Sequence, residues 1–450
     1  MGSVEPGKPF EKIIIVGAGP AGLLLALLLS QHNIPSLVLE SWDRLDERLR
    51  ATQYGVPATR IFRKAGLLDD FRAASITSFP SICWRRVSDH QRLAGIDLSV
   101  VRDHPDRMTI LPLNEIIKIM YRHCLERGNG LIDIRFNHKV VGTGQDERSA
   151  WVDVEAGAEG EVKEKKRFSA DYVVGCDGGS STVRKSLFGR EWPGQTFDFR
   201  LLVQNVWYDG FEKHGWDGGN YMVDRDYWGL IAKRGKGGLW RVTYGDKATG
   251  LTDEEYLARR NTAFKKLLPG HPDPGQYKIT QTDQFRIHNR CVEKMRVGRI
   301  LLAADAAHVC NPFGGYGCMT AVLDIGGLAD CLIGFYEGKA DESILDLYAD
   351  IRREKFLKYV DARSMKNLNR IMNTDPDTAL ETDPFLQLLK GLEGDAEATK
   401  AFLLVSRRRV RRVVNPQLFQ SEPFTGKTDP YSLQKYSSIE YDFTQHYKQQ

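Results

Sequence analysis

The sequence lacks the features of several large classes of protein. Its longest uninterrupted apolar run, Leu23–Leu29, is far too short to span a bilayer, and the first residues contain no apolar signal core. Basic and acidic side chains nearly balance, 63 against 59, so a net charge of +4 does not indicate a nucleic-acid partner. Seven cysteines, an odd number, show no paired metal-ligand spacing. We therefore expect a cytoplasmic globular protein with reduced thiols, no metal site and no transmembrane segment.

Length and composition favour two or three domains around a large core, because 42% of the 450 residues are hydrophobic. Glycine is concentrated in three stretches that lie far apart in the chain. They are GAGPAG at 17–22, CDGGSSTVR at 176–184 and AADAAHVCNPFGGYG at 303–317.

The first stretch predicts a nucleotide-binding turn. It follows the apolar run Ile13–Val16, which indicates a buried strand, and it precedes an apolar helix. Gly17 permits the tight turn, Gly19 lets the backbone approach a pyrophosphate, and Gly22 allows the helix to pack closely. The phosphates would lie at the helix N-terminus, where free N–H groups and the positive end of the dipole favour an anion.

An acidic residue ends the next predicted strand. Ser36–Leu39 forms that strand, and Glu40 follows it about 20 positions beyond the glycines, where a carboxylate can bind ribose hydroxyls. An acid here favours the free adenosine ribose of FAD or NAD over a 2′-phosphate. An ordinary glycine turn is the alternative, but the full order of strand, glycines, helix, strand and acid favours a dinucleotide. It does not separate FAD from NAD.

The other two stretches also follow predicted strands. Residues 171–175 lead into Asp177, and residues 299–303 lead into Asp305. Ligands of open α/β sheets bind at the carboxyl ends of strands, so both aspartates are expected beside a cofactor. The loop after Asp305 precedes a predicted helix from about Cys318, whose N-terminus would face something electron-rich.

Together, these motifs resemble those of the class A flavoprotein monooxygenases, the single-component family that includes p-hydroxybenzoate hydroxylase and phenol hydroxylase. By motif order the resemblance covers roughly residues 10 to 370, and it implies bound FAD with NADPH or NADH as a transient co-substrate. The cofactor-binding residues that it implies are Gly17, Gly19, Gly22, Glu40, Arg50, Asp177, Arg184, Asp305, Pro312, Gly315, Gly317 and Cys318.

The resemblance also assigns roles to some of these residues. Asp305 would bond the ribityl chain, and Pro312 would place a carbonyl beside the reacting edge of the flavin. Backbone N–H groups of 315–318 would face its N1 and C2 carbonyl, where a helix terminus stabilises the charge of reduced flavin. Arg50 would meet the pyrophosphate. Two departures stand out: Ala304, where glycine is usual, and Met319, where asparagine is common; alanine is a mild change unless φ is positive.

The expected fold class is α/β, with a discontinuous Rossmann-like FAD-binding domain of the p-hydroxybenzoate hydroxylase fold. Short alternating apolar and polar segments with many aromatics predict an inserted antiparallel sheet that covers the flavin and binds substrate. The predicted boundaries are 1–78, 105–190 and 286–372 for the FAD domain, 79–104 and 191–285 for the sheet domain, and 373–450 for a helical and extended C-terminal region.

The substrate is expected against the inserted sheet. Aromatic residues there predict a lined cavity, although sheets are naturally rich in aromatics and core packing is the alternative for each one. These residues are Trp207, Tyr221, Tyr227, Trp228, Trp240 and Tyr244. The predicted catalytic residues are Arg200, Tyr227 and Pro312, with Arg200 anchoring an anionic oxygen or donating a proton; a strand-edge charge is its alternative. Arg241 and His288 are weaker candidates, and His308 is expected to be a local hydrogen-bonding residue.

The resemblance implies a reaction in which NAD(P)H reduces the flavin and O₂ adds to give a flavin C4a-hydroperoxide, which an electron-rich ring attacks. The predicted function is hydroxylation of a phenolic or other electron-rich aromatic small molecule, in secondary metabolism of fungal type. Epoxidation of an indole or alkene with rearrangement stays open, as does a non-enzymatic binding protein on the same fold. A monomer or homodimer is expected.

Overall fold

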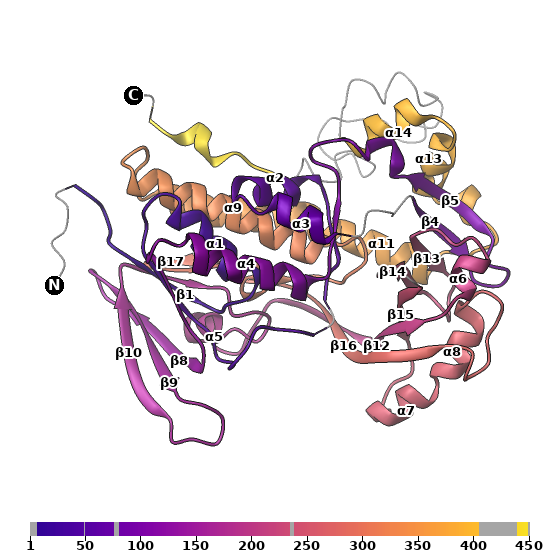
Figure 1. Ribbon diagram of the computed structural model, residues 1–450, viewed down its shortest axis with the longest axis horizontal. Coiled ribbons are helices and arrows are strands. Elements are labelled where there is room, and N and C mark those ends of the chain that lie inside the picture. The colour runs from indigo at the N-terminus through magenta and orange to yellow at the C-terminus, as the bar shows by residue number, and fades with distance from the viewer. Residues whose placement is uncertain (1–6, 49, 76–80, 235–237, 405–438, 449–450) are drawn as a thin grey trace.

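The computed structural model describes residues 7–48, 50–75, 81–234, 238–404 and 439–448 (Figure 1). In these ranges the chain forms sheets of six, three, eight and two strands. The six- and eight-stranded sheets lie in separate lobes, and the long strands β12 (Gly194–Trp207) and β16 (Lys278–Cys291) run between the lobes.

The six-stranded sheet carries the predicted nucleotide-binding fold. Strand β1 (Ile13–Val16) is buried along its whole length between two parallel neighbours, as its four β-branched residues favour. The order of the sheet is β17 (Arg296–Val297), β18 (Ile300–Leu302), β11 (Tyr172–Gly175), β1, β2 (Ser36–Leu39) and β7 (Ile132–Arg135). The ends of β1, β11 and β18 lead into the three glycine-rich motifs, which therefore meet at one edge of the sheet.

Helices cover one face of this sheet. Helix α1 (Pro20–Ser30) contacts both α4 (Leu113–Arg127) and α9 (Tyr316–Tyr336), which explains why almost every α1 residue is apolar and buried. Helix α9 is long and apolar enough to cross a membrane, but 83% of its most apolar window is buried inside the protein. Its composition is therefore that of a core helix. It also contacts α2 (Val56–Lys64) and α10 (Ile344–Lys355).

A three-stranded sheet consists of β10 (Glu164–Ala170), β9 (Ala150–Ala156) and β8 (His138–Gln145), in that order. Strand β9 of this sheet contacts β11 of the six-stranded sheet. Strand β8 contacts helix α5 (Thr182–Phe188).

The eight-stranded sheet forms most of the second lobe. Its order is β19 (His308–Val309), β16, β12, β15 (Leu239–Asp246), β14 (Gly229–Lys233), β13 (Gly219–Val223), β4 (Ser81–Arg86) and β5 (Arg92–Asp97). The segment expected to extend this sheet supplies β4 and β5, but β4 pairs parallel with β13, so the sheet is mixed rather than antiparallel. Strand β19 belongs to the third motif, which joins this sheet to the cofactor motifs.

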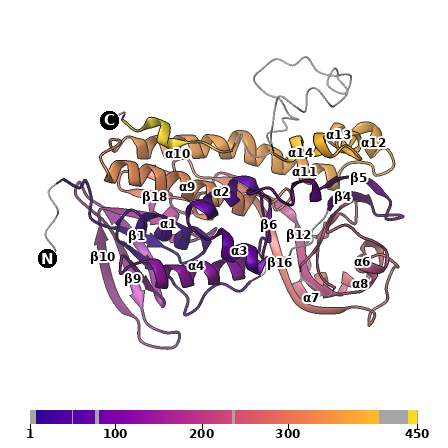
Figure 2. The same cartoon turned by 45° about the horizontal axis from the view of Figure 1, so that its top comes forward.

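The two faces of this sheet have different neighbours. The outer face packs against α6 (Gly210–Lys213), α7 (Asp253–Ala258) and α8 (Arg260–Leu267) around a core that includes Leu202, Trp240 and Phe264. On the other side the chain forms α11 (Ala362–Met372), α12 (Ala379–Thr382), α13 (Pro384–Leu392) and α14 (Ala396–Leu403) (Figure 2).

Three smaller elements lie beside α2 and α4. Helix α3 (Leu68–Ala74) follows α2, and β3 (Gln53–Tyr54) pairs with β6 (Thr109–Ile110). The backbone of 51–52 is fixed by two hydrogen bonds, Leu111 N–H to the Thr52 carbonyl at 2.9 Å and Leu113 N–H to the Ala51 carbonyl at 3.1 Å. These bonds hold the segment that carries Arg50 across the space between the lobes.

The C-terminal region, predicted as one unit over 373–450, has described parts in both lobes. Helices α12 to α14 lie beside β5, while residues 439–448, which include the turn η5 (Phe443–His446), run along α9. We call 439–448 the strap. A Cβ at Gly327 would lie 2.6 Å from the Phe443 ring, so α9 is narrow where the strap packs. The basic and proline-containing stretch within 405–438 lies outside the described residues.

Candidate functional site

A continuous cavity of 2310 Å³ connects the two lobes, and residues of all three glycine-rich motifs line it. Sites for one small ligand typically measure about 300–1,000 Å³, so this cavity has room for a dinucleotide and a second molecule. It runs from the turn after β1 to the inward face of the eight-stranded sheet.

The glycines of the first motif have separate functions. Gly17 has φ +104°, and a Cβ there would lie 2.6 Å from the Cys176 carbonyl oxygen, while a Cβ at Gly22 would overlap the Gly17 carbonyl. Both glycines therefore allow the turn to pack within the protein. A Cβ at Gly19 would meet no atom within 4 Å, so Gly19 presents bare backbone to the cavity, as the sequence predicts.

Glu40 fixes this turn from the end of β2. One carboxylate oxygen accepts the Ala18 N–H at 2.8 Å, and the other accepts the Trp42 N–H at 3.0 Å. The carboxylate also lines the cavity beside the turn, which is the position that ribose recognition requires.

The second motif builds the cavity wall. Asp177 accepts the N–H groups of Thr182 at 2.6 Å and Val183 at 3.2 Å, so it stabilises the first turn of α5, whose N-cap is Ser181. Arg184 is buried and donates to the carbonyls of Gly179 at 2.7 Å and Ala306 at 3.2 Å. Asp177 borders the cavity, but Arg184 lies behind it and ties the second motif to the third.

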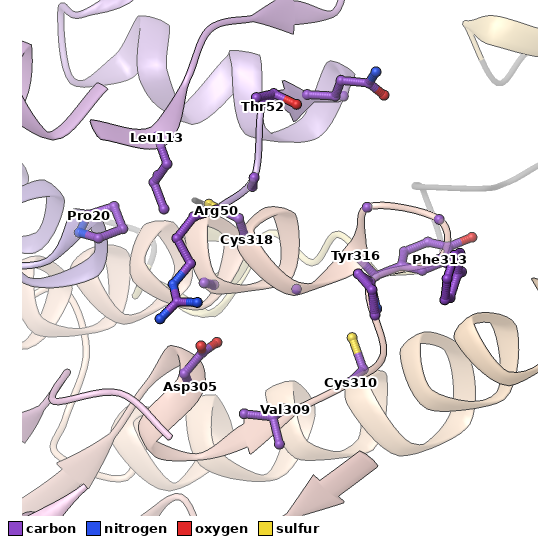
Figure 3. Close-up of a pocket in the computed structure, with 18 of the residues that line it drawn as sticks. Pro20, Arg50, Thr52, Leu113, Asp305, Val309, Cys310, Phe313, Tyr316 and Cys318 are labelled. Carbon is purple, nitrogen blue, oxygen red and sulfur yellow. The ribbon is translucent and has the colours of Figure 1, made fainter. Parts of the chain in front are cut away.

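In the third motif, Asp305 lies inside the protein with its carboxylate accessible from the cavity. Burial raises the pKa of Asp305, and the nearby His308 and Arg50 oppose that shift. Figure 3 shows Arg50 and Asp305 pointing toward each other across the cavity, with Cys318 beside Arg50. Burial lowers the pKa of Arg50, whose charge is available to a bound diphosphate.

The backbone before Asp305 is left-handed at an alanine. Ala304 has φ +57°, the condition under which alanine in place of glycine is strained. Its N–H donates to Asp324 Oδ2 at 3.1 Å, and Arg352 Nε donates to Asp324 Oδ1 at 2.7 Å. His308 Nε2 lies 2.8 Å from the same carboxylate, as expected of a local partner. We call Asp324, Arg352 and His308 the buried cluster; it holds the strained turn in place.

Asparagine side chains hold the loop that precedes α9. Asn289 on β16 accepts the Asn311 N–H at 2.8 Å and donates to Asp361 at 2.6 Å, and Asn311 accepts the Phe313 N–H at 3.2 Å. The Pro312 carbonyl accepts the Gly315 N–H at 3.1 Å, which closes a turn beside the cavity. No sequence motif predicts this role of Asn289, because its hydrogen-bond partners are distant along the chain.

The N-terminus of α9 opens into the cavity. Gly315 has φ +68° and no side chain caps this helix end. A Cβ at Gly315 or Gly317 would meet no atom within 4 Å, and Cys318 follows on the cavity wall. Met319 is buried away from the cavity, so that departure changes core packing and not the wall.

These residues fit FAD. Gly19, Gly178, Gly315 and Gly317 leave open backbone where a flat or phosphorylated ligand can approach. The N-termini of α1 and α9 face the cavity without side-chain caps and favour negative charge. Asp305 and Glu40 supply acceptors for hydroxyl groups on the same cavity.

The remaining part of the cavity is aromatic. Trp84 stacks on Tyr221 with ring centroids 4.8 Å apart, and Phe385 meets Trp84 edge-on at 5.3 Å. Phe285 and Phe313 complete the aromatic wall. Tyr221 was predicted; Trp84 and Phe385 were not. The signal for Phe385 is its spacing with Leu388 and Leu389 on α13, which also line the cavity.

Several predicted aromatic residues lie elsewhere. Trp240 and Tyr244 belong to the core on the outer face of the sheet, and Trp207 is 40% exposed. Trp228 is buried behind the cavity wall, with its ring 5.5 Å from the Phe313 ring. Tyr227 packs against the outer core and is not among the cavity residues.

Arg200 also points away from the cavity. Its guanidinium lies 3.5 Å from Asp253 and over the ring of Tyr256, both on α7, whereas its neighbour Leu201 lines the cavity. Successive side chains of a strand alternate between faces, so the two cannot share a face. The structure therefore brings Pro312 to the cavity but neither Arg200 nor Tyr227.

Comparison with known proteins identifies relatives that are named as monooxygenases. Residues 11–363 match the FAD binding domain family. The chain is 34% identical to para-nitrophenol 4-monooxygenase from a Pseudomonas species over 91% of this chain and 99% of that one. It is 31% identical to 6-hydroxy-3-succinoylpyridine 3-monooxygenase from Pseudomonas putida, over 81% of this chain and 90% of that one.

Solved structures show the same fold. The crystal structure of p-nitrophenol 4-monooxygenase from Pseudomonas putida matches with a TM-score of 0.79 and 32% identity, over 88% of this chain and 97% of that one. Aklavinone-11 hydroxylase, solved with FAD and aklavinone, matches with a TM-score of 0.70 over 84% of this chain and 71% of that one; at 22% identity it supports the fold alone. Cavity geometry, family match and relatives agree, and the chain belongs to the class A FAD-dependent monooxygenases.

Proposed function

We propose that this monooxygenase uses NADPH or NADH and O₂ to hydroxylate a phenol or another electron-rich aromatic ring. The observation that carries the proposal is the continuity of one cavity from the glycine cradle to the aromatic wall. A relative that covers nearly the full length is named for monooxygenation of para-nitrophenol, which is such a ring. In the overall reaction, one oxygen atom enters the ring and the other leaves as water, with two electrons supplied by the nicotinamide.

The cavity residues would divide this work between binding the cofactor and excluding water. FAD, when bound, supplies the redox chemistry that activates O₂. Gly19, Glu40 and Asp305 would hold its ADP and ribityl parts, and the α9 N-terminus would stabilise negative charge on its ring. Trp84, Tyr221 and neighbouring apolar residues would exclude water from the reacting ring and fix its orientation.

The test is turnover of the purified, FAD-loaded protein with labelled O₂. NADPH and NADH are each supplied with a panel of phenols that includes 4-nitrophenol, and products are analysed by mass. One labelled oxygen atom per product, coupled to nicotinamide oxidation, supports the proposal. Oxidation of the nicotinamide that yields only peroxide with every phenol would contradict it.

The product structure also separates hydroxylation from the alternative that was left open. An epoxide or a rearranged skeleton from an indole or alkene would replace aromatic hydroxylation as the function. The expected setting in fungal secondary metabolism, the cytoplasmic location and the monomeric or homodimeric state stay predictions; the two curated relatives described above are bacterial.

A further inference from the structure

On the face of the eight-stranded sheet that lines the cavity, β4 and β13 carry aromatic side chains and β15 carries a cationic one. Thr243 on β15 pairs with Leu230 on β14, which pairs with Tyr221 on β13, which in turn pairs with Trp84 on β4. This row leads from β15 to the aromatic wall. Neighbouring strands are about 4.8 Å apart, so β15 lies about 10 Å from the strand that carries Tyr221. A single substituted benzene ring fits that span.

Arg241 lies on the same face of β15, two residues before Thr243, and lines the cavity. The residue is only 9% exposed. Its Nε donates to Asn205 Oδ1 at 3.3 Å, and its Nη1 donates to the backbone carbonyl of Arg50. Its Nη2 is buried without a hydrogen-bond partner. Buried polar groups almost always have partners, so this nitrogen needs an explanation.

A second guanidinium lies close to the first. Arg234 follows β14, and its Nε and Nη1 are likewise buried without partners. Burial lowers the pKa of Arg241 to about 9, and the charge of Arg234 contributes to that shift. Burial also lowers the pKa of Arg234 to about 10. Asp283 attracts Arg241 electrostatically. Two adjacent cations with buried, unpaired N–H groups indicate a missing anion.

The place of Arg241 shows which anion would satisfy it. Its bond to the Arg50 carbonyl puts it where the segment between the lobes crosses the sheet, so the Arg241 side chain lies between the cofactor cradle and the aromatic wall. A charged hydrogen bond from a guanidinium is strong in such a water-poor place. An aromatic ring held against Leu230 and Tyr221 would direct one substituent toward it.

We propose that Arg241, supported by Arg234, binds the ionised hydroxyl oxygen of the aromatic substrate and selects phenolates over neutral rings. This inference rests on the proposed function. A phenolate is also the more electron-rich form of a phenol, so the same contact that binds the substrate favours its attack on an electrophilic oxygen.

The test measures binding to the oxidised, FAD-loaded enzyme without nicotinamide, so that no turnover occurs. The probes are 4-nitrophenol, whose anion is distinguished from the neutral form by its visible absorption, and its methyl ether 4-nitroanisole, which cannot ionise. The variants are Arg241→Met, Arg241→Lys and the control Lys233→Met. Lys233 is a cation on the outer face of the same sheet, 3.2 Å from Glu212. FAD content and the urea midpoint of each variant report whether it is folded.

The wild-type enzyme should bind 4-nitrophenol as the anion even below the pH at which it ionises in solution. Arg241→Met should weaken that binding roughly 10- to 100-fold, the range expected for a hydrogen bond to a charged group, and abolish the preference for the anion. Its affinity for 4-nitroanisole should stay near the wild-type value. Arg241→Lys should retain part of the preference for the anion, and Lys233→Met should retain all of it.

Unchanged binding of the nitrophenolate by folded Arg241→Met would overturn the inference while leaving the proposed function intact. Loss of FAD from that variant with normal 4-nitrophenol affinity after FAD is restored would assign Arg241 to the cofactor instead. Equal weakening of both probes would show a general packing role and also refute the inference. Failure of the wild-type enzyme to bind any phenol would refute the proposed function itself.

Discussion

Replacing Asp324 with asparagine should destabilise the FAD-binding lobe more than almost any other single change. Asp324 is fully buried and Arg352 is 1% exposed, so solvent does not screen the pair. Asparagine has nearly the same shape and can still accept the Ala304 N–H, but it leaves the Arg352 charge buried without a carboxylate. Breaking a buried ion pair in this way costs about 3–5 kcal/mol.

The assay is urea unfolding of the FAD-loaded protein, followed by tryptophan fluorescence and by release of FAD. Asp330→Asn is the matched control, because Asp330 lies on the same helix and pairs with Lys64, whose side chain is 39% exposed. Solvent-exposed pairs contribute about 0–1 kcal/mol, so the control should change stability little. The double variant Asp324→Asn with Arg352→Met should recover part of the loss, since it leaves no unpaired cation.

The pH dependence of this loss of stability follows from the direction in which the pKa of Asp324 is shifted. His308 and Arg352 outweigh the effect of burial and lower the pKa of Asp324, so the folded protein favours the charged form. The stabilisation is therefore fully present above the ordinary pKa of an aspartate, about 4, and is lost only as the pH falls through the lower folded value. The difference from wild type should be constant between pH 5 and pH 8, on the order of the values above. A loss below about 1 kcal/mol at neutral pH would refute this account of the buried cluster.

Three further predictions concern other parts of the molecule. Ala304→Val should destabilise the protein by about 1–3 kcal/mol and weaken FAD binding, because a β-branched residue at φ +57° is more strained than alanine. Ala304→Gly should be close to neutral. Equal urea midpoints for the wild type and both variants would contradict this prediction. Arg200→Ala should change kcat/KM for a phenol by less than about threefold, and a loss of 100-fold would show that Arg200 reaches the substrate after all. Truncation before the strap should lower the urea midpoint and speed FAD release, because it exposes the side of α9 at Gly327 and removes the Ile439 carbonyl from Arg352. Unchanged FAD release would show that the strap is dispensable.

The cofactor half of the site was predictable from the sequence because local chemistry decides it. A turn that follows a buried strand and needs glycine has the same form wherever it occurs, so Gly17, Glu40 and Asp305 could be placed by motif alone. The resemblance even identified Ala304 as the position where a positive φ would matter, and φ is positive there.

The substrate half could not be predicted, because the face on which a strand residue lies depends on register. Strand β12 has an irregularity between Thr196 and Arg200, and such a bulge changes which of two adjacent residues points inward. Until the pairing with β16 is known, either Arg200 or Leu201 could be the residue that faces the cavity. Phe385 was missed for a different reason: it comes from α13, which lies far beyond the inserted sheet in chain order.

The strap has a consequence for synthesis of the protein. Strand β1 of the FAD-binding lobe is translated before the second lobe, yet the strap that packs on α9 and meets Arg352 is translated after both lobes. The lobe cannot finish its core until the strap has been translated, and the strap comes after the substrate helices in chain order. Nascent chains would therefore hold α9 partly uncovered, and FAD retention during synthesis should be weaker than in the completed protein.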